Sequence, residues 1–351
     1  MLSSLPEPLP KCWTYSGPAA AVHPAAFPKP VLVVVVDTEE EFDWSQHFDR
    51  RKTGVAHMRH VERFQSICDA ARIRPVYVVD HPIATGRESV DALRAIHGRG
   101  ACEIGAHLHP WVSPPFDEEV NARNSYPGNL PRALEREKLA LLTTAIENSF
   151  GVRPRAYKSG RYGFGPNTAS ILEELGYDVD ISPAPPFDFQ DDGGPDWSTA
   201  PHQPYWLPTK RRVLALPNTG AYVGWAGASS HGLYGLAQKP AGRALHLGGV
   251  FARLGAVERL FLSPEGYAER DLMRLTRALL ARGARVFTLS LHSPSVEPGH
   301  TPYVRDEKDL HSLLAACRNY FHFFHSELGG ASMTASELFR HVETHSRTSR
   351  A

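Results

Sequence analysis

Short apolar runs alternate along the chain with stretches whose apolar residues recur at helical spacing. The run VLVVVV (31–36) is continuous and rich in β-branched residues, which predicts a strand buried on both faces. Further strands are predicted at 74–80, 101–109, from 155, and at 177–182, 258–265 and 285–293. Amphipathic helices are predicted near 57–72, 89–100, 131–151, 166–177, 266–282 and 307–328. This alternation predicts an α/β fold with a parallel sheet, and about seven strands favour a closed (β/α)7-type barrel over an open sheet.

Changes in composition mark the ends of the main domain. Residues 1–28 are rich in Pro, Ala and Ser and show no period, which indicates an extended N-terminal arm. Residues 29–330 carry the strand and helix pattern and are expected to form one domain. Within it, 183–243 is rich in Pro, Gly, Asp and Trp, and we expect a long insertion with short strands such as RRVLALP. Residues 331–351 are expected to be a C-terminal tail.

The bulk composition is close to the average of globular proteins, with 42% hydrophobic and 22% charged residues in 351. Lys plus Arg and Asp plus Glu both number 38, so the net charge gives no indication of binding to nucleic acid or to an anionic membrane. The four cysteines form no C-x-x-C pair, and we expect them to be reduced. The N-terminal sequence lacks the pattern of a secretory signal, and the longest apolar run is too short to span a bilayer. We therefore expect a cytoplasmic protein.

Acidic residues follow the first predicted strand directly, in DTEEEFDW. Because side chains alternate along a strand, Asp37 and Glu39 should point to the same side. Two carboxylates so close repel each other unless a cation or a shared proton relieves them. A solvated acidic loop is the alternative interpretation, so this motif alone favours a functional site only slightly.

A His-x-His pair follows the third predicted strand, in GAHLHPW. His107 and His109 should also point to one side, and neutral imidazole is a common ligand of zinc and its first-row neighbours. A single histidine would more often be a hydrogen-bonded core residue, but two at this spacing opposite a carboxylate pair favour a metal site. Two imidazoles and one carboxylate, with a coordination position left open, are typical of a hydrolytic zinc site.

Further titratable residues lie past two later strands. Lys158 and Arg161 follow the strand that begins at 155, and His292 follows the last one. The local sequence around His292 is equally compatible with a structural hydrogen-bonding role, but its position at the end of a strand favours function. In a parallel barrel the carboxyl ends of all strands meet at one rim, so all of these polar residues should converge there.

In this order the motifs resemble those of the polysaccharide deacetylase superfamily (NodB homology, carbohydrate esterase family 4). The resemblance runs from about residue 30 to about residue 325. It is closest to the WalW-type subgroup, which carries segments similar to HLHPW and to HSPS-x-EPG-x-TPYVR. The resemblance implies that the main domain is a catalytic domain with the irregular barrel of that superfamily.

The resemblance also implies roles for the acidic residues and for His292. Asp37 matches the catalytic base of the first motif. Glu39 matches its metal-binding acid, with Glu40 as the alternative. Asp180 matches the acid of the fourth motif, and His292 matches the histidine of the fifth, which acts as the catalytic acid.

The second and third motifs depart from the superfamily pattern. The second normally has two histidines four residues apart, and this chain has Trp111 at that distance from His107, so we take His109 as the second ligand. The third motif supplies a basic residue that orients the base. Direct alignment gives Lys158, with Arg161 close behind. We favour Arg161, because a planar guanidinium binds a carboxylate better than an ammonium group does.

The resemblance implies a metal-dependent hydrolase that acts on a carbon–nitrogen amide bond and removes the acetyl group from an N-acetylated amino sugar or saccharide. One divalent metal, with zinc expected, would be held by the carboxylate and the two imidazoles. Asp37 would take a proton from the attacking water, and His292 would protonate the departing amine. The alternatives are an amidohydrolase acting on a small cyclic or linear amide, and a non-catalytic homologue that binds saccharide. The departures in the second and third motifs favour the latter somewhat, but mere binding needs neither a base nor an acid.

Overall fold

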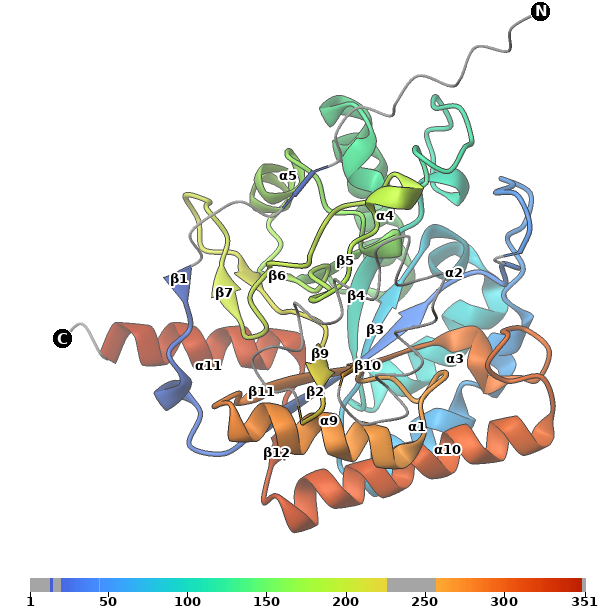
Figure 1. Ribbon diagram of the computed structural model, residues 1–351. Helices are drawn as coiled ribbons and strands as arrows, with labels where there is room; N and C mark the ends of the chain where they lie inside the picture. Colours follow the sequence, from blue (N-terminus) through green and yellow to red (C-terminus); the bar gives the residue numbers. More distant parts are fainter. Residues whose placement is uncertain (1–12, 15–19, 44, 226–256, 349–351) are drawn as a thin grey trace, which may run out of the picture.

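A curled sheet of parallel strands stands at the centre of the computed structural model, which describes residues 13–14, 20–43, 45–225 and 257–348 (Figure 1). The seven parallel strands are β2 (Val31–Thr38), β3 (Val76–Val79), β4 (Glu103–Leu108), β5 (Ala156–Ser159), β6 (Val179–Asp180), β8 (Leu214–Ala215) and β11 (Val286–His292). They pair in the order β8-β6-β5-β4-β3-β2-β11. The predicted α/β class with a parallel sheet is confirmed.

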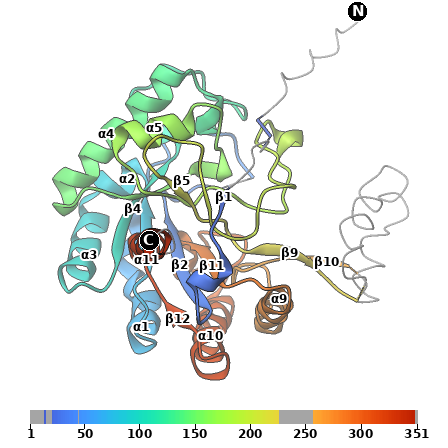
Figure 2. The same cartoon turned by 90° about the vertical axis from the view of Figure 1, so that its left-hand side faces the viewer.

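Helices form a ring around the outside of the strands, as Figure 2 shows. The ring consists of α1 (Glu62–Ala70), α2 (His81–Thr85), α3 (Arg87–Gly98), α4 (Arg132–Phe150), α5 (Thr168–Leu175), α9 (Glu269–Ala281) and α10 (Glu307–His322), whereas α11 (Ala335–Thr348) lies at its centre. Their ends follow local chemistry: Asp306 caps α10 by accepting from the Asp309 N–H at 2.8 Å, and Gly151 ends α4 at a φ of 69°. No helix in the described ranges is long and apolar enough to cross a membrane.

Short helical turns join many of these elements. The 3-10 turns are η1 (Pro24–Ala26), η2 (Ala56–His60), η3 (Pro110–Val112), η4 (Pro127–Asn129), η5 (Gly160–Tyr162), η6 (Gln190–Asp192) and η8 (Ser293–Val296). A π-helical turn, η9 (Phe323–Glu327), continues α10. Three of the 3-10 turns, η3, η5 and η8, follow a parallel strand directly, so the chain turns sharply where the strands end.

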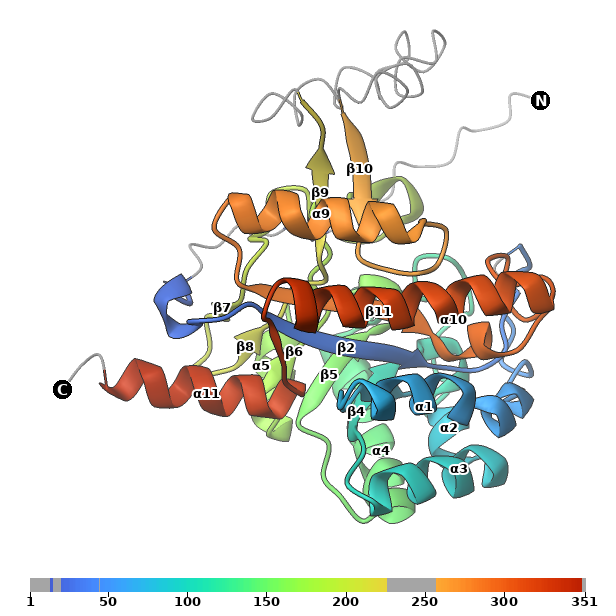
Figure 3. The same cartoon turned by 90° about the horizontal axis from the view of Figure 1, so that it is seen from below.

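Two segments differ from the predicted strand pattern. The strand predicted at 258–265 forms β10 (Glu258–Phe261), which pairs antiparallel with β9 (Gly220–Val223) in a separate two-stranded sheet. The RRVLALP segment of the expected insertion supplies β8, the seventh parallel strand. Figure 3 shows β9 and β10 extending away from the main sheet beside α9. The periodicity of a short apolar run therefore predicted a strand correctly but not the sheet to which it belongs.

The sheet curls into a half-barrel. Individual backbone hydrogen bonds, and not a ladder, connect β11 with the segments beside β9 and β10. The Thr219 N–H donates to the Thr288 carbonyl at 3.3 Å, and the Ser290 N–H donates to the Leu262 carbonyl at 3.1 Å. Thr219 directly precedes β9 and Leu262 directly follows β10, so these hydrogen bonds connect the ends of both strands with β11, where a regular barrel would have a ladder. The barrel is irregular at this seam.

Both ends of the chain pack on the sheet in their described parts. β1 (Ala20–Ala21) pairs antiparallel with β7 (Tyr205–Trp206), which continues the sheet beyond β8. β12 (Ala331–Ser332) pairs parallel with the first residues of β2. Most of the expected N-terminal arm, and residues 226–243 of the expected insertion, lie outside the described residues.

Helix α11 closes the amino end of the curled sheet. Its buried residues Ala335, Leu338 and Val342 share one apolar cluster with strand residues such as Val33 and Val286. Their spacing puts them on one stripe of the helix. Figure 2 shows α11 end-on at the centre of the ring. The segment that we expected as a C-terminal tail is thus, up to residue 348, a strand and a helix packed on the sheet.

Strand alternation makes the inside of the half-barrel apolar at one end and polar at the other. Val35 lies in the same inner cluster as α11, and the next inside position of β2 is Asp37, at the carboxyl end of the strand. The parallel register pairs His292 of β11 with Asp37, and His107 of β4 with Lys158. The polar residues predicted from the sequence therefore come together at the carboxyl rim.

If α11 is an integral plug, truncating its buried stripe should destabilise the whole domain. Leu338→Ala should lower the free energy of unfolding by about 2–5 kcal/mol, because it removes a buried side chain and leaves a cavity. Arg340→Ala, at an exposed position of the same helix, should change it by no more than about 0.5 kcal/mol. Urea unfolding followed by circular dichroism measures both. Equal, small effects of the two variants would mean that α11 is a dispensable appendage.

Candidate metal centre

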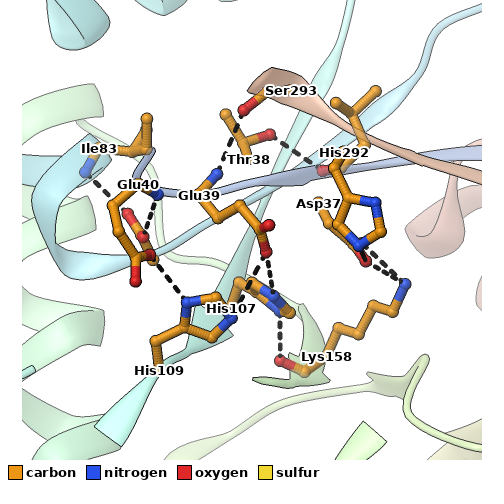
Figure 4. A network of polar contacts seen from close by, with 12 residues as sticks. Asp37, Thr38, Glu39, Glu40, Ile83, His107, His109, Lys158, His292 and Ser293 are labelled. Carbon is orange, nitrogen blue, oxygen red and sulfur yellow. Dashed lines mark hydrogen bonds and ion pairs between the residues drawn. The ribbon is translucent and has the colours of Figure 1, made fainter. Parts of the chain in front are cut away.

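Three of the predicted residues form a tight, buried cluster at the carboxyl rim (Figure 4). Oε2 of Glu39, just past β2, lies 3.4 Å from Nε2 of His107 on β4. The same oxygen lies 3.4 Å from Nε2 of His109, which directly follows β4. All three side chains are buried. Strand alternation accounts for the arrangement of the two rings, since His107 and His109 are two residues apart.

The ring nitrogens that face Glu39 can act as metal ligands. Nδ1 of His107 lies 3.0 Å from the Lys158 carbonyl, which can only accept, so in a neutral ring Nε2 carries the lone pair. Nδ1 of His109 lies 2.8 Å from Oε2 of Glu40, and burial lowers the pKa of His109. Two imidazole lone pairs and a carboxylate thus meet in a buried place. This donor set fits a divalent cation of the zinc type.

Glu39 itself carries the negative charge that such a cation needs. Burial opposes its ionised form, but the positive charge of His292 and the contacts with His107 and His109 lower the pKa of Glu39 to about 2. Its backbone is held as well, since the Glu39 N–H donates to Oγ of Ser293 at 3.2 Å. Glu39 therefore presents an ionised and positioned carboxylate.

Glu40, the alternative to Glu39, lies behind the cluster and orients His109. Its carboxylate accepts from Nε1 of Trp111 at 2.8 Å and lies against Nδ1 of His109. Its own N–H donates to Oδ2 of Asp80 at 2.8 Å. Burial raises the pKa of Glu40 to about 7 and that of Asp80 well above its usual range. Glu40, Asp80 and His109 also come within ligand distance of one another, but hydrogen bonds already use these atoms. The geometry favours Glu39 as the ligand.

A glycine makes room for His109. A Cβ on Gly160 would collide with the His109 ring and would lie 2.6 Å from the Leu108 carbonyl. The ring also stacks on Trp111, with 4.3 Å between centroids. Trp111 therefore packs against the ring of His109.

Asp37 is bound by Lys158. The ammonium Nζ donates to both carboxylate oxygens of Asp37 at 2.7 Å, and both side chains are buried. Lys158 stands at the inside position of β5, opposite His107 in the register, which explains why it reaches the rim. The ammonium group also lies 5.1 Å from the centroid of the Tyr162 ring.

The prediction that Arg161 holds Asp37 was wrong. Arg161 stands in η5, after the strand has ended, with a φ of 56° that turns the side chain away from the base. Its guanidinium donates to Oγ of Ser125 at 2.5 Å and forms an ion pair with Asp192. Its Cζ lies 4.0 Å from the centroid of Tyr126. A planar guanidinium binds a carboxylate better than an ammonium group does. Lys158 nevertheless makes the contact, because strand alternation puts it at the inside position of β5.

His292 lies beside Asp37 on the neighbouring strand. Its Nε2 is 3.7 Å from Oδ2 of Asp37, and its Nδ1 is 2.7 Å from Oε2 of Glu265. Burial opposes the charged ring, but the negative charges of Glu265, Glu39 and Asp37 outweigh it and raise the pKa of His292 to about 10. The raised pKa favours the protonated ring, whose Nε2 lies toward Asp37.

Glu265 was not selected from the sequence, although a signal was present. It follows the apolar run of β10 within a few residues, as Asp37 ends the run of β2. Its carboxylate also accepts from the His292 N–H at 3.1 Å and from the Ser295 hydroxyl. The rule that polar residues past a strand are candidates would have included Glu265 if it had been applied to every strand.

A second set of residues missed in the sequence supports Glu39 from behind. Oγ of Ser293, which accepts from the Glu39 N–H, lies 2.8 Å from Nε2 of His57. Nδ1 of His57 lies 3.1 Å from Oε1 of Glu41, and this contact lowers the pKa of Glu41 to about 2. The order Ser, His, Glu is that of a hydrolytic triad, but Ser293 and His57 are fully buried. The chain of bonds serves to position the backbone that carries Glu39.

Asp180 does not reach the cluster. It is fully buried on β6, and its Oδ1 accepts from the Ser182 N–H at 3.1 Å and from the Ser182 hydroxyl at 2.5 Å. Burial raises the pKa of Asp180 to about 7. Asp180 is not among the residues that line the cavity at the rim. The match of Asp180 to a site acid is therefore not supported by its position.

The cluster opens into a cavity of about 330 Å³ at the carboxyl rim. Asp37, Glu39, His107, His109, Lys158 and His292 all line it. Its remaining walls combine polar side chains such as Ser159 and Thr301 with aromatic rings such as Phe42 and Tyr303. The cavity is of the size of small-molecule sites, and titratable groups converge at its floor.

No protein-family model matches the sequence, and no curated protein matches it either. Solved structures share the fold. A protein from Mycobacterium smegmatis, provisionally named a polysaccharide deacetylase, has a TM-score of 0.53 at 18% identity, with 94% of this chain and 96% of that chain covered. A similarly named protein from Pseudomonas aeruginosa PAO1 has a TM-score of 0.51 at 15% identity, with 93% and 94% covered.

A third structure of this fold carries a different name. The allantoinase Puue has a TM-score of 0.54 at 17% identity, with 93% of this chain and 94% of that chain covered. Likeness at such identities establishes a common fold. The chain therefore has the irregular half-barrel fold that is found in structures named as polysaccharide deacetylases and as an allantoinase.

Proposed function

We propose that the protein is a metal-dependent hydrolase that removes the acetyl group from an N-acetylated amino sugar or saccharide. The observation that carries the proposal is the meeting of Glu39, His107 and His109 in one cavity with Asp37 and His292. We also propose that the chain is a member of the polysaccharide deacetylase superfamily. Its HLHPW and HSPSVEPGHTPYVR segments support the WalW-type subgroup.

The three clustered side chains would hold one divalent cation. Two neutral imidazoles and one carboxylate are a zinc-type donor set, so zinc is the proposed ion. When bound, such an ion supplies Lewis-acid polarisation of a carbonyl and lowers the pKa of a water molecule. Glu40 accepts from Nδ1 of His109, and Oγ of Ser293 accepts from the Glu39 N–H, and these hydrogen bonds keep the ligands in place.

Asp37 acts as the base that takes a proton from the attacking water. It lines the cavity beside the cluster, and Lys158 holds both of its oxygens. An ammonium that bridges both oxygens fixes the carboxylate plane and balances its charge in a buried place. Asp37 is thereby held in one orientation before substrate binds.

His292 acts as the acid that delivers a proton to the departing amine. Glu265 binds Nδ1, so that Nε2–H is the group that faces the cavity. An amine is a poor leaving group until it is protonated, and a positioned acid of this kind contributes about 10²–10⁴-fold in rate. A protein that only binds saccharide needs neither a base nor an acid, so the pairing favours hydrolysis over the non-catalytic alternative.

A small cyclic or linear amide is a second candidate substrate. The observation that favours it is the likeness to the allantoinase structure, at a TM-score of 0.54. The same base, acid and metal ligands would serve the hydrolysis of a ring amide. Parallel assays of the zinc-loaded protein separate the two: acetate release from N-acetylglucosamine oligosaccharides supports the first candidate, and opening of allantoin supports the second.

His107→Ala should remove the metal. We expect one zinc ion per chain in the parent protein, measured by elemental analysis after removal of loosely bound ions. Loss of a ligand should weaken zinc binding by more than the about 10–100-fold that loss of a supporting residue costs. Ser293→Ala, which removes only a partner of the Glu39 backbone, should fall within that range.

His47→Ala is the matched control for the metal measurement, because His47 is exposed and does not belong to the cluster. It should bind zinc as the parent does. A parent protein that binds no stoichiometric zinc, or a His107→Ala protein that binds it as tightly as the parent, would contradict the metal assignment.

Asp37→Asn should abolish most turnover without loss of the metal. The amide keeps the shape of the side chain but accepts a proton far less well, so kcat should fall by about 10²–10⁴-fold. Zinc content and kcat are measured on the same preparation. Asp43→Asn, at an exposed position, is the control and should retain the parent kcat. An Asp37→Asn protein with the parent kcat would show that another group is the base.

Glu265→Gln should change the pH dependence of turnover. The protonated form of His292 is the active one, so kcat falls as the pH rises through the pKa of His292. Removing the negative charge of Glu265 lowers this pKa, because that charge is the largest of those that raise it. The alkaline limb of the pH–kcat profile should therefore move to lower pH. If the alkaline limb of the Glu265→Gln profile lies at the same pH as that of the parent, His292 is excluded as the titrating acid.

A further inference from the structure

A second cavity, of about 180 Å³, lies beside the metal centre. We call it the aromatic annexe. Six of its lining residues are aromatic, namely Tyr162, Phe187, Phe189, Phe261, Tyr267 and Tyr303, and the polar ones are Ser263, Glu265, Ser290 and His292. We propose that the annexe receives the acyl group of the substrate, and that the protein hydrolyses amides whose acyl group is much larger than acetyl, up to the size of an aromatic ring. This inference rests on the proposed amide hydrolysis and specifies its substrate class.

The rings of the annexe form one continuous wall. Phe187 stacks on Phe189, with 5.9 Å between centroids and 8° between planes. Phe189 stacks on Tyr162 at 5.5 Å and 15°. Phe261 meets Phe187 edge to face at 5.4 Å and 89°. Such a wall offers both flat faces and ring edges to an apolar guest.

The annexe and the main cavity are neighbours that share lining residues. His292, Tyr162, Phe189 and Tyr303 line both spaces. In this inference the carbonyl carbon lies beside the base and the clustered ligands, with one of its two substituents directed past His292 into the annexe. The other substituent lies in the main cavity. The two substituents of one amide bond can occupy the two spaces at the same time.

The chemistry of the walls decides which substituent goes where. Beyond the metal centre, the main cavity combines aromatic rings such as Phe42 and Tyr126 with polar side chains, among them Ser159, Arg161, Asp192 and Thr301. These donors and acceptors suit the hydroxyl groups of a sugar. The annexe is aromatic on most sides, and its apolar wall suits a group without hydroxyls. The sugar thus belongs in the main cavity and the acyl group in the annexe.

The size of the annexe sets the size of the acyl group. An apolar cavity of about 150 Å³ can hold a benzene molecule. The annexe, at about 180 Å³, is therefore far too large to be filled by the single methyl group of acetyl. Butyryl and benzoyl groups would cover the aromatic wall, which acetyl leaves exposed to water.

The test compares N-acetyl-, N-butyryl- and N-benzoylglucosamine as substrates of the zinc-loaded protein, with release of glucosamine as the common readout. One methylene group in an apolar pocket changes kcat/KM by about 10–200-fold. We therefore expect kcat/KM for the butyryl or the benzoyl compound to exceed that for the acetyl compound by at least about 10-fold. A protein that cleaves the acetyl compound best contradicts the inference while it supports the proposed function.

Phe187→Ala removes part of the wall from a residue that lines only the annexe. It should lower the ratio of kcat/KM for the benzoyl over the acetyl compound several-fold. Phe48→Ala is the matched control, because Phe48 is a partly buried ring that lines neither cavity. It should keep the parent ratio. An unchanged ratio in Phe187→Ala overturns the assignment of the acyl group to the annexe.

A binding measurement separates failure of this inference from failure of the proposed function. Benzohydroxamate and acetohydroxamate chelate zinc through the same atoms and differ in the group that would enter the annexe. Calorimetry on the zinc-loaded protein should give a lower Kd for benzohydroxamate in the parent and a smaller difference in Phe187→Ala. If none of the glucosamides is cleaved but this pattern holds, the annexe is retained and the sugar amide is excluded. If the two hydroxamates bind equally in both proteins, the annexe inference fails.

Discussion

Glu39 and the two histidines set the constraint on which the rest of the site depends. A carboxylate oxygen lies 3.4 Å from each of two ring nitrogens in a buried place, with the opposite nitrogen of each ring already bound. Three electron-rich atoms so arranged are costly to keep together unless a positive charge lies between them or close by. The protonated His292 supplies part of that charge. A divalent cation would supply it fully.

The fold meets this constraint by separating an apolar from a polar part along the same strands. The inside positions of β2 run from Val31 to Val35 in the apolar cluster with α11, and end on Asp37. The parallel register then brings neighbouring strands to the same height, with His292 opposite Asp37. The plug formed by α11 and the site at the rim are thus two ends of one arrangement. The apolar cluster that stabilises the fold lies at the amino end of the strands, and the charged groups lie at the carboxyl end.

Strand alternation explains how much of the site could be predicted from the sequence. Lys158, His107 and His292 are inside residues at strand ends, and the prediction that they converge with Glu39 follows from local periodicity and parallel pairing alone. The preference for Arg161 as the partner of Asp37 was wrong. It rested on the geometry of a guanidinium–carboxylate pair and left out the turn after β5, which directs Arg161 away from Asp37.

Residues that act through non-local contacts could not be found in this way. The hydrogen-bonded chain from Glu41 through His57 to Ser293 joins positions more than 200 apart in the sequence, and no local pattern marks it. The sheet to which each short strand belongs could not be predicted from local patterns either. The apolar runs of β8 and β10 are alike, and only the packing of the whole chain puts β8 into the main sheet and β10 beside β9.

The central claim is that one cation lies between Glu39, His107 and His109, and locating the ion tests it most directly. Crystals grown with stoichiometric zinc, measured on both sides of the zinc absorption edge, give the position of the ion independently of activity. The account predicts one anomalous peak per chain, at bonding distance from Oε2 of Glu39 and from Nε2 of both histidines. A peak among Glu40 and its neighbours instead, or no ordered zinc at the carboxyl rim, would contradict it.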